Sequence, residues 1–203
     1  MPTSSRLLSL LFGGLLAAGP ALAATVTVVV RDAAGKPLAD AAVFLESAEA
    51  RAAVKPGRNA AIAQEQRQFT PRVTLVTVGT PVVFPNRDTV RHHVYSFSPV
   101  KTFELKLYAG TPANPVVFDR AGIAVLGSNL PDNMSAWVVV VDTPYHGRTG
   151  ADGSVTLEGV PAARYRLRAW HPSQPVGAPA SERDLTVLAG GASVAAQLRD
   201  ARP

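Results

Sequence analysis

Histidines carry most of the chemistry that this chain could perform, because it contains four of them and no cysteine. Imidazole can act as a general base or bind a metal ion. His92 and His93 are adjacent, and successive residues of a strand point to opposite faces. A site on one face would therefore use His92, and His93 is expected to be structural or exposed. His146 and His171 each lie near a proline in a turn-forming stretch, which favours a surface role.

Enzymatic interpretations find little support in the sequence. It has no cysteine nucleophile, no Gly-x-Ser-x-Gly elbow, no glycine-rich phosphate loop and no His-Glu-x-x-His pattern. Its acidic residues form no close pair of the kind that general acid–base catalysis uses. The sequence therefore predicts a protein that is not an enzyme.

The N-terminal segment has the features of an export signal. Arg6 precedes an apolar stretch over residues 7–18, and a helix-breaking proline and small residues follow. We expect residues 1–23 to be a signal peptide and the mature chain to begin at Ala24 or Thr25. This predicts a periplasmic or secreted protein with no membrane association after cleavage. A retained anchor is the alternative, although the stretch is short for a membrane span.

Short apolar runs with a period of two predict an all-β chain of the sandwich type. Turn-forming residues separate the runs. Residues 46–66 are alanine-rich, and they are the only segment expected to hold a short helix or a loop. The expected strands are Thr25–Val30, Ala42–Leu45, Val73–Val78, Val82–Phe84, Phe103–Tyr108, Val116–Phe118, Trp137–Val141, Val155–Leu157, Tyr165–Trp170 and Leu185–Leu188.

The two ends of the chain resemble the two halves of one small module. The hairpin around Asp32-Ala-Ala-Gly-Lys-Pro-Leu-Ala-Asp40 and the stretch from Thr149 to Arg168 resemble the carboxypeptidase-regulatory or transthyretin-like sandwich. Gly150 and Ala163 depart from the pattern of that family. The superfamily of this sandwich includes carbohydrate-binding modules.

The central motifs resemble a different family. Val82-Val-Phe-Pro-Asn-Arg-Asp88, His92-His-Val-Tyr-Ser-Phe-Ser98, Lys101 to Gly110 and Leu126 to Tyr145 occur in the order seen in plastocyanin-like methylamine utilization proteins of bacteria. The resemblance covers residues 67–172. It implies a cupredoxin-like Greek-key sandwich and copper-dependent electron transfer.

This resemblance also implies a ligand set that the chain has partly lost. The family loop reads Gly-Cys-Asn-x-His-Asp-x-Met, and an upstream histidine completes the site. Ser128 stands at the thiolate position and Pro131 at the second imidazole position, so only His92 and Met134 remain. A blue-copper site needs a thiolate and two imidazoles, with methionine as a weak axial ligand. We therefore expect no type 1 copper, no other cofactor, and a non-enzymatic binding or accessory role.

The two resemblances predict how the chain is divided. A cupredoxin-like domain at residues 64–142 would be inserted into a small transthyretin-like β-sandwich formed by residues 25–47 and 143–198. Insertion is tolerated at exposed loops whose ends lie close together. A single larger sandwich without separable halves is the alternative.

Three other functions stay open. The first is a periplasmic copper-binding or electron-transfer protein with an atypical site, in which His92 and Met134 act with a ligand from elsewhere. The second is a carbohydrate-binding module that uses Tyr145, Tyr165 and Trp170, although aromatic residues on strands are usually core. The third has Ser128 as a nucleophile with His92 as its base, but the sequence shows no group that would orient the histidine.

The charge pattern restricts the partners. The formal net charge is +5, and the charged residues are scattered, which does not indicate a nucleic-acid partner. Arg164, Arg166 and Arg168 alternate with less polar residues, so a strand here would present three guanidinium groups on one face. That row is expected to be a solvated outer face or a docking surface for an acidic partner. A periplasmic protein partner is possible, and the sequence does not identify it.

Overall fold

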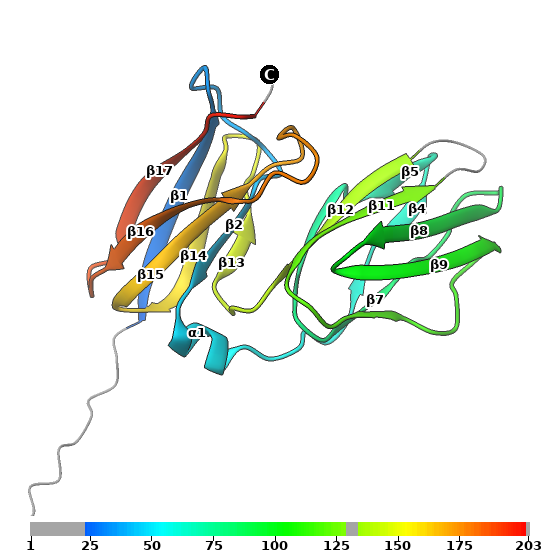
Figure 1. The fold of residues 1–203 in the computed structure, drawn as a ribbon, viewed down its shortest axis with the longest axis horizontal. Coiled ribbons are helices and arrows are strands. Elements are labelled where there is room, and N and C mark those ends of the chain that lie inside the picture. Colours follow the sequence, from blue (N-terminus) through cyan, green and yellow to red (C-terminus); the bar gives the residue numbers. More distant parts are fainter. Residues whose placement is uncertain (1–22, 129–133, 202–203) are drawn as a thin grey trace, which may run out of the picture.

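Strands dominate the computed structural model, which describes residues 23–128 and 134–201. The predicted all-β class is confirmed, and the described chain forms several sheets gathered in two lobes (Figure 1). In these residues the only helix is α1 (Ala48–Ala53). No helix in the described part is long and apolar enough to cross a membrane.

One lobe contains strands from both ends of the chain (Figure 1). Its strands are β1 (Ala23–Asp32), β2 (Ala42–Glu46), β13 (His146–Arg148), β14 (Ser154–Pro161), β15 (Ala163–Trp170), β16 (Ser181–Val187) and β17 (Ala192–Leu198). They form a sheet of order β14-β1-β17 and a second of order β13-β2-β15-β16. The alternating valines of β1 are fully buried between these sheets, which explains the strict period of two in its sequence.

The other lobe contains the middle of the chain. Its strands are β3 (Ala60–Ala61), β4 (Ala63–Glu65), β5 (Gln68–Thr70), β6 (Val73–Thr77), β7 (Thr80–Val83), β8 (His92–Ser98), β9 (Lys101–Tyr108), β10 (Val116–Phe118), β11 (Gly122–Ser128) and β12 (Met134–Val141). The main sheet has the order β6-β12-β11-β8-β9, and smaller sheets of order β10-β7-β3 and β4-β5 accompany it. Phe84, Phe118 and Leu126 belong to the separate core of this lobe.

The segment predicted to hold a short helix contains α1, but it also contains strands. Ser47 caps the helix, because its hydroxyl accepts a hydrogen bond from the Ala50 amide at 3.0 Å. The alanines after residue 59 then enter β3 and β4, which the sequence did not predict. Alanine has a weak β-propensity, so pairing with β7 and β5 decides the conformation here.

The two lobes contact each other through a third apolar cluster. Phe44 and Trp170 from one lobe pack with Val139 and Val141 from the other. Arg148 spans the same contact, because its guanidinium donates to the Val73 carbonyl at 2.9 Å. These contacts bury the C-terminal half of β12, residues 138–141, on both faces, which accounts for its unbroken run of valines.

Candidate functional site

The inner face of the main sheet brings three of the predicted site residues to one end. His92, Ser128 and Met134 are all buried, and they lie on β8, β11 and β12, which are neighbours in the sheet. Ser128 is paired in register with Met134. The fourth predicted position, Pro131, lies outside the described residues. The structure therefore places His92, Ser128 and Met134 on adjacent strands of one sheet, with all three side chains buried.

His92 is held by a carboxylate that sequence reasoning did not single out. Its Nε2 lies 2.7 Å from Oδ2 of Asp88, four residues earlier in the chain. Asp88 also accepts hydrogen bonds from the backbone amides of Gln66 and Arg67 at 2.7 and 3.0 Å. Gln66 and Arg67 have φ values of 53° and 57°, so this carboxylate satisfies the turn between β4 and β5. The spacing of Asp88 and His92 was the one signal that could have revealed the pair.

The charge state of Asp88 follows from these contacts. Burial by itself raises the pKa of Asp88, but the hydrogen bonds from His92, Arg67 and Gln66 outweigh it and lower the pKa below its ordinary value. The carboxylate is thus ionised at neutral pH. Its natural donor is an Nε2–H group, which leaves Nδ1 of a neutral His92 with a lone pair.

The other ring nitrogen of His92, Nδ1, is buried and has no hydrogen-bond partner in residues 23–128 and 134–201. Metal-binding histidines commonly donate their other ring N–H to a carboxylate, which is the role of Asp88 here. Asp88 and His92 are therefore arranged like a metal-binding histidine and the carboxylate that orients it.

The remaining donors do not match type 1 copper. The chain has no cysteine, and the hydroxyl of Ser128 is a hard donor that stays protonated at neutral pH. The described residues contain no group of three or more histidine, cysteine, aspartate or glutamate side chains suited to a metal ion. One imidazole and one thioether cannot supply the trigonal ligand plane of a blue-copper centre.

A serine nucleophile is also unsupported by the geometry. Asp88 is the orienting group that such a mechanism would need. However, Nδ1 of His92, the atom that would have to act as the base, accepts no hydrogen bond from the Ser128 hydroxyl. The nucleophile–base contact is therefore not formed.

The other histidines lie away from this site. His93 points to the opposite face of β8, as predicted. There its Nε2 lies 2.9 Å from Oε1 of Glu104, and its ring centroid lies 5.2 Å from that of Tyr95. His146 and His171 are half-buried, so the expected surface role is only partly met, and burial lowers the pKa of each.

The aromatic residues considered for glycan binding belong to apolar clusters. Tyr165 and Trp170 are buried, and Tyr145 packs edge-on against Tyr165 with ring centroids 5.9 Å apart. The hydroxyl of Tyr165 donates to the carbonyl of Pro161 at 2.7 Å. None of these three rings presents the exposed face that stacking on a sugar would use.

Two of the three arginines in the row pair with acidic neighbours. Arg166 contacts Glu182 at 2.7 Å, and Arg168 contacts both Glu46 at 2.7 Å and Glu182 at 2.9 Å. These pairs reduce the positive potential on the face of β15 that an acidic partner would need. Exposed pairs of this kind contribute little to stability.

Comparisons with solved structures find a distant similarity to copper proteins over about half of the chain. No protein-family model and no curated protein matches the chain. A point mutant of amicyanin in its reduced Cu(I) form is 21% identical over 49% of this chain and 98% of that chain, with a TM-score of 0.37. The purple cupredoxin of Nitrosopumilus maritimus is 20% identical over 40% of this chain and 99% of that protein, with a TM-score of 0.35.

A third similar structure is the copper-containing nitrite reductase of Thermus scotoductus SA-01. It is 19% identical over 43% of this chain, with a TM-score of 0.38. The matched part is only 23% of the length of that enzyme. The chain is thus distantly similar to cupredoxins over about half its length.

Proposed function

We propose that the protein is an exported, cupredoxin-like binding or accessory protein that has lost type 1 copper and performs no catalysis. One observation carries the proposal. Ser128 is buried opposite Met134 and on the same inner face as His92, at the position where the family motif has its thiolate. In this proposal the scaffold of a copper site is retained around a residue that cannot make the required bond.

The rest of the proposal concerns location and architecture. The lobe that contains both chain ends is proposed to be a transthyretin-like sandwich, and its separate apolar core supports an inserted central domain. The N-terminal signal pattern supports export to the periplasm or the medium. We propose that the partner is a protein in that compartment.

Export gives a direct expectation for the native N-terminus. Because small residues follow the apolar stretch, the mature chain is expected to start at Ala24 or Thr25. Intact-mass measurement on protein from its native host checks this. A membrane-bound form that retains Met1 would contradict it.

Copper titration tests the central claim. We expect no intense visible absorption when Cu(II) is added, because that band needs a thiolate bound to copper. Visible absorption and calorimetry would be recorded for the wild type, for His92→Ala and for His93→Ala as a matched neighbour on the outer face.

One result would favour a second function. The unpartnered Nδ1 of His92, oriented by Asp88, is the specific observation in favour of an atypical copper site. A single stoichiometric copper ion that is lost in His92→Ala, kept in His93→Ala and weakened in Met134→Ala would establish that site. It would overturn the proposal of a protein without copper.

A further inference from the structure

A cavity between the two lobes has the properties of a small-molecule site. It has a volume of about 560 Å³, within the roughly 300–1,000 Å³ typical of ligand pockets. Strands β11 and β12 form one wall, and β2, β15 and residues 172–180 form the other. Binding pockets occur preferentially at such domain junctions.

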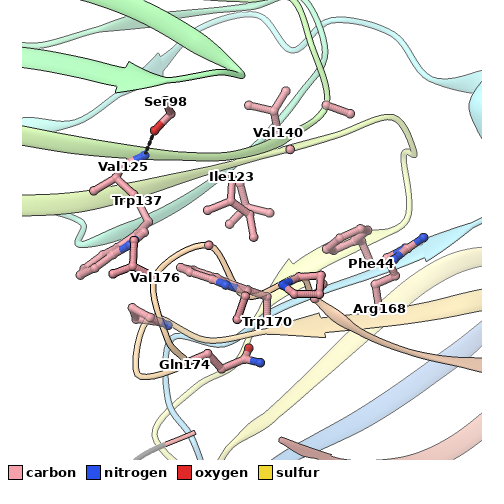
Figure 2. Close-up of a pocket in the computed structure, with 18 of the residues that line it drawn as sticks. Phe44, Ser98, Ile123, Val125, Trp137, Val140, Arg168, Trp170, Gln174 and Val176 are labelled. Atoms are coloured by element: carbon pink, nitrogen blue, oxygen red, sulfur yellow. Dashed lines mark hydrogen bonds between the residues drawn. The ribbon is translucent and has the colours of Figure 1, made fainter. Parts of the chain in front are cut away.

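The walls are mainly apolar and include two indole rings. Figure 2 shows Ile123, Trp137, Trp170 and Val176 arranged around the hollow. The ring centroids of Trp137 and Trp170 are 6.3 Å apart, with 52° between their planes. The guanidinium of Arg72 lies 4.9 Å from the Trp137 ring centroid, which helps to hold that ring in place. Trp170 is only 4% exposed and supports the wall from behind, whereas the partly exposed ring of Trp137 offers an aromatic surface that suits a flat ring system.

The polar groups of the lining restrict the charge of the occupant. Glu46 and Arg168 are the only charged residues among those that line the cavity, and they pair with each other at 2.7 Å. Ser98 Oγ already accepts from the Val125 amide, and Gln174 Oε1 accepts from the His171 amide. A charged or many-hydroxyl ligand would lose hydration here without enough partners in return.

We propose that this cavity binds an uncharged, mainly apolar small molecule with a flat ring system. The inference is independent of the copper-site proposal, because no residue of the His92 site lines the cavity. It also differs from glycan binding, which would need many more hydrogen-bonding groups.

The test uses N-phenylnaphthylamine, a neutral probe with one naphthyl and one phenyl group, whose fluorescence rises in apolar surroundings. We expect saturable binding of one equivalent, and weaker binding of the anionic probe anilinonaphthalene sulfonate. Val125→Glu places a carboxylate in the cavity wall and is expected to weaken probe affinity about tenfold or more. Val117→Glu is the matched control, because Val117 is a strand valine of similar exposure, 42% against 37%, outside the cavity.

Several outcomes would overturn the proposal. They are unsaturable binding, equal affinity in Val125→Glu and the wild type, equal losses in Val117→Glu and Val125→Glu, and displacement of the probe by cello-oligosaccharides. Thermal unfolding identifies a misfolded Val125→Glu. In that case Ala178→Asp gives the same test, because Ala178 lines the cavity from residues 172–180, is half-buried and has a small side chain that contributes little packing.

Discussion

Ser128→Cys combined with Pro131→His is expected to give a protein that turns intensely blue with Cu(II). The double variant restores both residues that the family motif has and this chain lacks. His92 and Met134 already lie on the same inner face as Ser128, and strand pairing, not a metal, positions them. Visible absorption and electron paramagnetic resonance would detect the thiolate–copper band and the type 1 signal.

Single and triple variants make this test specific. Ser128→Cys alone lacks the second imidazole and Pro131→His alone lacks the thiolate, so neither should show the full type 1 spectrum. Adding His92→Ala to the double variant should abolish it. Copper binding with only the weak spectrum of an ordinary tetragonal site would mean that the loop has diverged from the ligand geometry. No copper binding would mean that the alignment of Ser128 and Pro131 is wrong.

Asp88→Asn is expected to lower the free energy of unfolding by about 2 kcal/mol at neutral pH. The carboxylate accepts hydrogen bonds from His92 and from the amides of Gln66 and Arg67, and its side chain is only 15% exposed. An amide of the same shape has one acceptor oxygen, so at least one of these donors loses its partner. Chemical denaturation of both proteins measures the difference.

The effect of Asp88→Asn is also expected to depend on pH. The pKa of Asp88 in the folded protein is lowered from 3.8, so its ionised form stabilises the fold fully above that pH. This contribution is lost as pH falls below 3.8, and the two proteins should then converge in stability. Asp119→Asn is the control, since the Asp119 side chain is 70% exposed and its carboxylate forms a long ion pair with Lys101, at 3.6 Å. A difference that stays constant down to about pH 3 would show that the ionised carboxylate is not the acceptor.

Local patterns in the sequence determined much of the fold. Alternation of apolar residues predicts strands because each strand buries one face, and β1 follows this rule closely. The same period of two placed His92 and His93 on opposite faces of one strand. The absence of cysteine by itself removes the thiolate that type 1 copper needs. None of these conclusions requires knowledge of which strands are neighbours.

Other features depend on contacts between segments that are distant in the chain. Asp88 satisfies a turn more than twenty residues earlier, and only the paired strands bring that turn to it. The cavity lined by Trp137 and Trp170 exists only because the two lobes meet there. Sequence periodicity reports which face of a strand is buried, but the identity of the covering element is decided by packing of the whole chain. Tertiary structure alone therefore decided the partner of His92 and the position of the cavity.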